Sequence, residues 1–264
     1  MADWQRDLEL ITDAARQAGD VAMRYFGKSP EVWWKNEGRS PVSAADFAAN
    51  ETLETLLRGA RPDYGWLSEE TDDDATRLKR ETLFVIDPID GTRAFIAGQD
   101  TWCVSVAVVH RGRPVAGVLV APAFGEVFSA AKNVPAMKNG APIRVKERAA
   151  GEPLRLAVSE DMLAKLAPTF VHHVERIRHV PSLAYRLAMV ADGRIDGTLV
   201  KRNAHDWDLA AADLILEQAG GRLVDLAGEG LVYNRPQVVH GELCGATADD
   251  LSRLLYQLTL GLKG

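Results

Sequence analysis

The sequence has few cysteines and no long hydrophobic run. Its two cysteines, Cys103 and Cys244, could form at most one disulfide in 264 residues, so we expect two buried thiols in a cytoplasmic protein. The longest hydrophobic stretches, such as residues 102–109, are strand-sized and too short to span a membrane. Charges are scattered through residues 1–19, so we expect no signal peptide there and no contact with a membrane.

Positive charge is also scarce. The chain has 31 Lys and Arg against 37 Asp and Glu, a formal net charge of -6, whereas binding to a nucleic-acid polymer needs a basic surface. A small phosphorylated ligand is still compatible with this charge, because a bound metal ion can reverse the local sign. The sequence also lacks a P-loop, a Gly-x-Ser-x-Gly elbow, a dinucleotide fingerprint and a His/Cys cluster typical of zinc sites.

The first half of the chain mixes helical and strand-like patterns. Hydrophobic residues make up 47% of the chain and charged residues 26%, the balance of a soluble globular protein. The spacing of hydrophobic residues predicts helices at 3–26 and, after a turn, within 40–60. It predicts strands at 31–35, 82–91, 102–110 and 114–122, with further strands and turns at 125–131 and 135–145. The turn Arg111-Gly112-Arg113 predicts a hairpin between the last two strands. We therefore expect an α+β first half.

The second half alternates between strands and helices. The pattern predicts strands and helices in turn at 154–159, 161–174, 177–181, 182–193, 196–200, 208–221 and 222–225, with a last helix from Thr247. Such alternation favours an α/β arrangement. The charged and small residues at 146–153 mark the expected boundary. We predict an α+β half over 1–148 and an α/β half over 149–264, in one compact unit with the active site between them.

A hydrophobic strand ends in the motif Asp-Pro-Ile-Asp-Gly-Thr at residues 87–92. Pro88 restricts Asp87 to an extended conformation, and Gly91 permits a positive φ or a close backbone approach. Thr92 can then cap the segment that follows, with N–H groups near the carboxylates of Asp87 and Asp90. Taken alone, the motif could be an ordinary turn. Its other interpretation is a corner that binds a divalent metal and a phosphate.

Two further acidic corners favour the metal-binding interpretation. Glu69 and Glu70 end a second hydrophobic segment, and Asp206 and Asp208 open a predicted helix. Three acidic corners at the ends of hydrophobic elements would repel one another if they met without a cation. Carboxylates and a carbonyl are the ligands that Mg²⁺ prefers. A magnesium site is therefore expected.

These motifs together resemble the inositol monophosphatase superfamily. The Asp-Pro-Ile-Asp-Gly-Thr motif matches its first signature, and residues 207–211, Trp-Asp-Leu-Ala-Ala, match its second. Residues 68–70, Ser-Glu-Glu, match its upstream acidic pair, and residues 40–46 resemble a helix entry that ends in a catalytic aspartate. The resemblance covers nearly the whole chain. It implies a layered αβαβα sandwich of the inositol monophosphatase and sugar phosphatase type, in a homodimeric phosphomonoesterase that depends on two to three Mg²⁺ ions.

The resemblance also implies a role for each matching residue. One ion would bind Glu69, Asp87 and the carbonyl of Ile89. A second ion would bridge Asp87, Asp90 and Asp208, and a third, weaker ion would contact Glu69 and waters.

The remaining roles concern the attacking water and the substrate. Asp46 and Thr92 would orient or deprotonate the water that attacks phosphorus, and the N–H groups of Gly91 and Thr92 would hold the phosphate. Asp208 and Ser182 would also contact the substrate. The segment Pro181-Ser182-Leu183 stands where the superfamily often has Gly-Ser-Ser or Gly-Thr-Ala, so this wall of the pocket is expected to differ.

The substrate is expected to be a small phosphate ester. Lys201 and Arg202 stand where inositol-specific relatives usually carry a glutamate; they are either two surface cations or a site for a second anionic group, as in 3'-phosphoadenosine 5'-phosphate. Residues 40–46 and Arg93 resemble the bisphosphate nucleotidase branch, which is our first choice. Inositol 1-phosphate is the alternative, followed by histidinol phosphate, because residues 90–95 also resemble histidinol-phosphate phosphatases. A non-catalytic regulator ranks last, because every proposed ligand is present.

Four other features leave two interpretations each. Glu70 and His205 could support the metal ligands or be ordinary surface and loop residues. Residues 71–80 could form a solvated loop or a mobile lid. Trp33 and Trp34 are interpreted as core and interface residues rather than a stacking platform.

Overall fold

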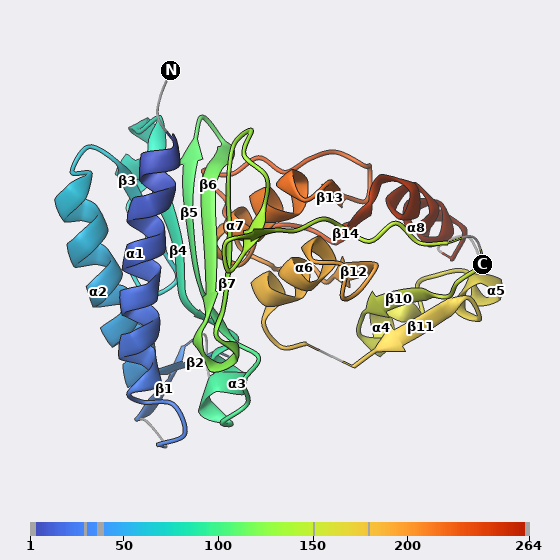
Figure 1. Cartoon of the computed structure of the whole chain (residues 1–264), viewed down its shortest axis with the longest axis horizontal. Helices are drawn as coiled ribbons and strands as arrows, with labels where there is room; N and C mark the ends of the chain where they lie inside the picture. Colours follow the sequence, from blue (N-terminus) through green and yellow to red (C-terminus); the bar gives the residue numbers. More distant parts are fainter. Residues whose placement is uncertain (1–3, 29–30, 36–39, 150, 179, 262–264) are drawn as a thin grey trace.

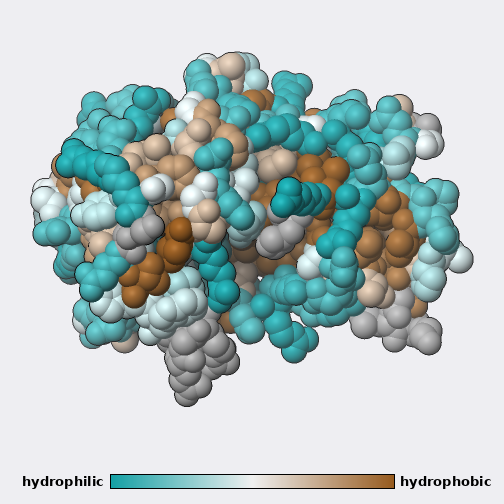
Figure 2. Space-filling view, turned by 90° about the horizontal axis from the view of Figure 1, so that it is seen from below, coloured by the Kyte–Doolittle hydropathy of each residue, from teal (hydrophilic) through white to brown (hydrophobic). Residues whose placement is uncertain are grey.

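The computed structural model describes residues 4–28, 31–35, 40–149, 151–178 and 180–261. They form five layers, helices alternating with sheets (Figure 1). The predicted layered αβαβα sandwich is confirmed. None of the described helices combines the length and the hydropathy needed to cross a membrane. From below, the surface is mostly hydrophilic, with a recessed strip of hydrophobic residues near the middle of the face (Figure 2).

The first layer holds helices α1 (Trp4–Met23) and α2 (Ala44–Ala60). They cover the outer face of a seven-stranded sheet in the order β3-β4-β5-β6-β7-β8-β9. Its strands are β3 (Gly65–Ser68), β4 (Thr82–Asp90), β5 (Cys103–His110), β6 (Arg113–Ala121), β7 (Glu126–Ala131), β8 (Met137–Lys138) and β9 (Ala141–Pro142). Only the pair β3 and β4 is parallel. Helices cover both faces, which explains why β5 is a continuous hydrophobic run rather than an alternating one.

The middle layer contains α6 (Leu183–Ala191) and α7 (Asp206–Gln218), between the two sheets. Helix α7 approaches β6 so closely that a Cβ on Gly117 would lie 2.9 Å from the carbonyl oxygen of Ala211. A glycine is needed there because real Cβ atoms do not come that near to backbone. This contact fixes how close the helix lies to the first sheet.

The second sheet has the order β11-β10-β12-β14-β13. Its strands are β10 (Leu154–Ala157), β11 (Val174–Ile177), β12 (Gly197–Val200), β13 (Gly221–Asp225) and β14 (Leu243–Thr247). The last layer packs on the outer face of this second sheet. It consists of α4 (Glu160–Leu163), α5 (Pro168–Val171) and α8 (Ala248–Gly261). Strands between residues 65 and 142 thus lie in the seven-stranded sheet and strands from residue 154 in the five-stranded sheet; the division at residue 148 stays a prediction.

Several elements differ from the prediction. The helix expected over 161–174 is two short helices, because Pro168 starts a new helix and cannot donate to the preceding turn. The strand expected at 177–181 lies earlier, as β11. Strand β14 was not predicted, and neither was β2 (Ser40–Ser43), which pairs with β1 (Val32–Lys35) ahead of α2. Beyond β4, Gly91 leads into the short helix α3 (Thr92–Ile96), and the 3-10 helices η1 (Ala75–Lys79) and η2 (Pro122–Phe124) complete the described elements.

Candidate active site

The end of β4 places two carboxylates on the same side of the chain. In a regular strand, residues three positions apart point to opposite faces. The register against β5 shifts here: Asp87 pairs with Ser105 and Asp90 with Cys103, so three steps on β4 match two on β5. The extra residue is a β-bulge, which re-aims the side chains that follow it. Asp87 and Asp90 can therefore face one space, and both are buried.

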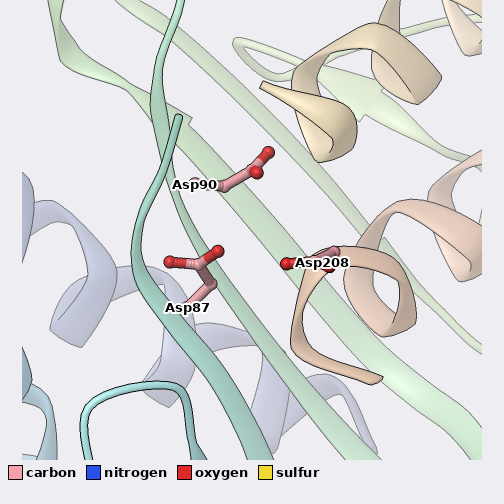
Figure 3. Close-up of side chains that lie close together, drawn as sticks. All are labelled: Asp87, Asp90 and Asp208. Atoms are coloured by element: carbon pink, nitrogen blue, oxygen red, sulfur yellow. The ribbon is translucent and has the colours of Figure 1, made fainter. Parts of the chain in front are cut away.

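Asp208 reaches the same space from the first turn of α7 (Figure 3). One carboxylate oxygen from each of Asp87, Asp90 and Asp208 lies within 4.8 Å of the other two. Asp208 also closes a capping box, in which its Oδ2 accepts from the N–H of His205 at 2.7 Å. Helix capping therefore fixes its side chain.

Each of the three carboxylates is held in the structure by one of its oxygens. Asp87 Oδ1 accepts from the N–H of Ile89 at 3.0 Å. Asp90 Oδ2 accepts from the hydroxyl of Ser182 and from the N–H of Ala184, at the start of α6. Asp208 uses its Oδ2 in the capping box. These bonds fix the orientation of all three carboxylates around the shared space.

The carboxylates repel one another. Burial raises the pKa of Asp87 well above its usual range, and the negative charges of Glu69, Asp90 and Asp208 raise it further. Burial and Asp208 raise the pKa of Asp90 to about 7, against hydrogen bonds from Ser182 and α6. A cation between the carboxylates would remove this repulsion. Hard oxygen donors this close together fit a divalent ion such as Mg²⁺.

The sequence-predicted ligands Glu69 and Ile89 border this corner. Glu69 follows β3, and its N–H donates to the carbonyl of Ile86 on the parallel neighbour β4 at 3.1 Å. Its charge is the largest cause after burial of the raised pKa of Asp87, but its carboxylate is not in the group whose oxygens lie within 4.8 Å of one another. The carbonyl of Ile89 accepts from the hydroxyl of Thr92 at 3.0 Å.

Asp46 and Thr92 meet beside the three carboxylates. The hydroxyl of Thr92 lies 3.1 Å from Asp46 Oδ1. Asp46 Oδ2 accepts from both the N–H and the hydroxyl of Ser43, which forms a capping box at the start of α2. Burial raises the pKa of Asp46, while the bonds from Ser43 and Thr92 act in the opposite direction. A threonine that donates to a fixed carboxylate keeps its lone pairs available to accept a hydrogen bond from a water.

Nearly the whole chain matches a family model. The model of the inositol monophosphatase family aligns with residues 3–258. The chain belongs to the inositol monophosphatase family. The corner formed by Asp87, Asp90 and Asp208 is thus the candidate metal site of a phosphatase family.

Relatives within the inositol monophosphatase family are named for different substrates. A histidinol-phosphatase from Chlorobaculum parvum is 31% identical over 242 residues, 89% of this chain and 90% of that protein. A 3'(2'),5'-bisphosphate nucleotidase CysQ from Salmonella typhimurium is 31% identical over 235 residues, 86% of this chain and 93% of that protein. A solved IMPase structure from Thermotoga maritima has a TM-score of 0.85 and 26% identity, covering 98% of each chain.

Gly91 and Ser182 line the inner wall of this family site. Gly91 adopts a φ of 98°, and a Cβ there would lie 3.0 Å from the carbonyl oxygen of Thr101 and 3.3 Å from the side chain of Ser182. Ser182 is fully buried, donates to Asp90 and caps α6 through the N–H of Tyr185. These contacts make Ser182 a support of Asp90; the substrate contact expected from the sequence stays a prediction.

Lys201 and Arg202 lie at the rim of a hollow of about 250 Å³ next to the metal corner. Both are exposed, and each already has a partner: Lys201 Nζ is 2.8 Å from Asp161, and Arg202 is 3.6 Å from Glu242. Leu183 lines the same hollow and its N–H bonds to Asp90, so the hollow adjoins the carboxylates.

Arg186, which was not among the residues predicted from the sequence, lines this hollow from α6. It is 9% exposed, and burial lowers its pKa to about 10, with Asp90 acting in the opposite direction. Its Nε has no hydrogen-bond partner, and no acceptor for its guanidinium occurs among the described residues. A lone arginine in the hydrophobic helix Leu-Ala-Tyr-Arg-Leu-Ala was the signal that could have identified it.

The other sequence-predicted features have mixed outcomes. Cys103 and Cys244 are free and buried, as predicted. Trp33 and Trp34 are 43% and 59% exposed, so the core interpretation is wrong; the Trp33 ring packs on Phe47. His205 stacks on Trp207, with ring centroids 4.6 Å apart. The homodimer, the cytoplasmic location and the roles of Glu70 and Arg93 stay predictions.

Proposed function

We propose that this chain is a Mg²⁺-dependent phosphomonoesterase whose substrate carries a second anionic group. The best candidate is 3'-phosphoadenosine 5'-phosphate, hydrolysed to AMP and phosphate as by a 3'(2'),5'-bisphosphate nucleotidase. One observation favours this substrate class over a simple monophosphate: the buried guanidinium of Arg186 has no acceptor among the described residues and lines a hollow beside the carboxylates. A buried charge without a partner is costly, and an anionic ligand would offset that cost.

In this proposal two to three Mg²⁺ ions bind at the end of β4. Asp87, Asp90, Asp208, Glu69 and the carbonyl of Ile89 supply the ligands. Bound Mg²⁺ would lower the pKa of a coordinated water and neutralise charge on the phosphate. The protein's own part is to hold its carboxylates close together and to fix them by the hydrogen bonds to Ile89, Ser182, Ala184 and His205.

Asp46 and Thr92 would handle the proton of the attacking water. Thr92 donates its hydroxyl proton toward Asp46 Oδ1. Its oxygen can then accept a hydrogen bond from the water and orient it for attack on phosphorus. Asp46 is buried, and its raised pKa makes it a better proton acceptor than a solvated aspartate.

The substrate would lie across the metal corner and the hollow. The N–H groups of Gly91 and Thr92 would hold the phosphate that is cleaved. Arg186 would contact the second phosphate from inside the hollow, and Lys201 and Arg202 would contact it from the rim. The similarity to the nucleotidase from Salmonella typhimurium supports the bisphosphate nucleotide as substrate. The histidinol-phosphatase has the same identity to this chain, so Arg186 and not the identity favours the bisphosphate nucleotide over histidinol phosphate.

A phosphate-release assay with Mg²⁺ tests the proposal. Its substrates are 3'-phosphoadenosine 5'-phosphate, inositol 1-phosphate, histidinol phosphate and fructose 1,6-bisphosphate. We expect the fastest turnover with the bisphosphate nucleotide. Faster turnover of inositol 1-phosphate or histidinol phosphate would assign the chain to that activity instead, and no turnover with any phosphate ester would favour a non-catalytic regulator.

The role of Arg186 is tested by substitution. We expect Arg186→Met to lower kcat/KM for the bisphosphate nucleotide by about one to two decades, the usual loss for a charge-assisted hydrogen bond, and to spare a small monophosphate. Lys201→Glu should lower the same kcat/KM by no more than about fivefold, because the charge of Lys201 is exposed and already paired with Asp161. An equal loss on both substrate types would contradict the proposal, since it would indicate damage to the metal corner.

A further inference from the structure

Arg77 is a buried arginine in the segment that follows Glu69 and Glu70. It is 2% exposed, so the prediction of a solvated loop over 71–80 is wrong at this residue. Its Nε and Nη2 bind the carboxylate of Asp73 at 2.6 and 2.8 Å. This bidentate pair uses only part of the guanidinium, and the remaining donors point to a different part of the chain.

Those donors reach a loop more than 150 residues away in the sequence. Arg77 Nη1 donates to Asn234 Oδ1 at 2.7 Å, and Nη2 donates to the carbonyl of Arg235 at 3.1 Å. Asn234 returns a longer bond from Nδ2 to the carbonyl of Arg77, at 3.4 Å. Asn234 has a φ of 56°, so the loop is turned sharply at the point of contact.

The same loop holds the start of α7. The N–H of Asn234 donates to Asp206 Oδ2 at 2.9 Å, and His240 Nε2 lies 2.7 Å from Asp206 Oδ1. Asp206 is fully buried and is the first residue of α7. Its own N–H donates to the carbonyl of Val238. The loop and the first turn of α7 are therefore locked together, two residues before Asp208.

We propose that Arg77 is a positioning residue for metal binding, through the chain of contacts Arg77–Asn234–Asp206. It ties the segment that begins at Glu69 to the helix turn that presents Asp208. Mutually repelling carboxylates from separate elements bind a cation tightly only if the backbone holds them at the right separation. This inference rests on the metal-dependent activity proposed above.

The test measures metal binding directly, without turnover. Mn²⁺ is titrated into the metal-free protein, and the free ion is followed by its EPR signal. Arg77→Met removes the bridge. Asn234→Gly removes only the side-chain contact, because glycine tolerates the positive φ and its N–H can still donate to Asp206. We expect each variant to raise the Kd for Mn²⁺ about tenfold. This is the lower end of the range of about 10- to 100-fold that is usual when a residue supporting the metal ligands is lost.

Arg148→Met is the matched control. Arg148 is also mostly buried and paired with an aspartate at 2.9 Å, but this partner is Asp250, in the first turn of α8, and none of the proposed metal ligands lines the hollow beside the pair. Its loss should leave the Kd within about twofold of the wild type.

Three outcomes would overturn the inference: wild-type affinity in Asn234→Gly, wild-type affinity in a folded Arg77→Met, or equal weakening in Arg148→Met. If Arg77→Met does not fold, Asn234→Gly decides. A wild-type protein that binds no Mn²⁺ would instead refute the metal-dependent function itself.

Discussion

At the scale of single residues, the hydroxyl of Thr92 lies between two groups to which the proposed mechanism gives different roles. It bridges Asp46 Oδ1 and the carbonyl of Ile89, so it joins the proposed proton acceptor to a proposed metal ligand. Asp46 is buried, whereas Thr92 is half-buried, so the hydroxyl lies between the buried carboxylate and the solvent. A side chain so placed can act on the attacking water without binding the rest of the substrate.

Thr92→Ala is therefore expected to lower kcat by about two to four decades, the usual contribution of a positioned acid or base, with little change in KM. Thr92→Ser keeps the hydroxyl and should retain most of the activity. Steady-state kinetics at saturating Mg²⁺ measure both variants. An alanine variant with the wild-type kcat would mean that another group orients the water.

At the scale of elements, α6 links the metal corner to the hollow. Its first turn donates to Asp90 through Ser182 and Ala184, and one turn later Arg186 lines the hollow. The N-terminal end of α6 thus fixes the carboxylate of Asp90, and its next turn places the guanidinium of Arg186 in the hollow. A shift of α6 would change both sites together.

Ser182→Ala tests this coupling. The variant loses the cap of α6 and the hydroxyl that donates to Asp90. We expect a loss of about 1 kcal/mol in the free energy of unfolding, from the cap, and weaker binding of Mg²⁺. Urea unfolding and Mg²⁺ titration measure the two effects. Ser252→Ala, which removes an exposed hydroxyl on α8, is the control and should change neither. A destabilised variant with unchanged Mg²⁺ affinity would limit Ser182 to capping.

Local patterns in the sequence predicted those elements whose cause is local. The hairpin of β5 and β6 follows from Arg111 and Gly112, which adopt φ values of 49° and 78° as such a turn requires. Pro168 indicates a helix break, but the helical spacing of hydrophobic residues on both sides of it led to the prediction of one continuous helix over 161–174. Strand β14 was missed because its residues, Leu-Cys-Gly-Ala-Thr, are mostly small, and its pairing on both sides with β12 and β13 is non-local.

The same division holds for the site. Asp87, Asp90 and Asp208 come together as predicted, because each belongs to a recognisable motif. Arg186 was missed because a single charge in a hydrophobic helix does not by itself reveal what it faces. The bond from Arg77 to Asn234 could not be predicted at all, since it depends on how two loops from distant parts of the chain meet.

At the scale of the whole molecule, buried carboxylates outside the site also make stability depend on pH. Asp213 on α7 is 3% exposed and accepts from the hydroxyl of Tyr233 at 2.9 Å. Burial raises the pKa of Asp213 to about 6, although Arg113, 4.0 Å away, and Tyr233 act in the opposite direction. Burial outweighs them because the Arg113 side chain is itself largely exposed.

The direction in which stability changes with pH follows from the number of protons that the folded and unfolded states bind. Between pH 4 and pH 6 the folded protein keeps a proton on Asp213 that the unfolded chain has released, so its contribution to stability falls as pH rises through this window. Asp213→Asn keeps an acceptor for Tyr233 but carries no charge. We expect the variant to lack this fall and to be more stable at pH 8, by at most about 3 kcal/mol. Urea unfolding at pH 4.5 and pH 8 checks it; identical pH dependence in both proteins would contradict it.

The metal ligands and the residues around the hollow belong to different elements, and this separation has an evolutionary consequence. The carboxylates are anchored to β4 and α7, where the bulge and the Gly117 contact leave little freedom. Lys201 and Arg202 are exposed residues just after β12, where replacement costs little stability. Under the proposed function, a lineage would therefore diverge from one phosphate ester to another through substitutions at the rim that leave the metal ligands in place. That relatives of equal identity carry the names of different substrates is the expected record of such divergence.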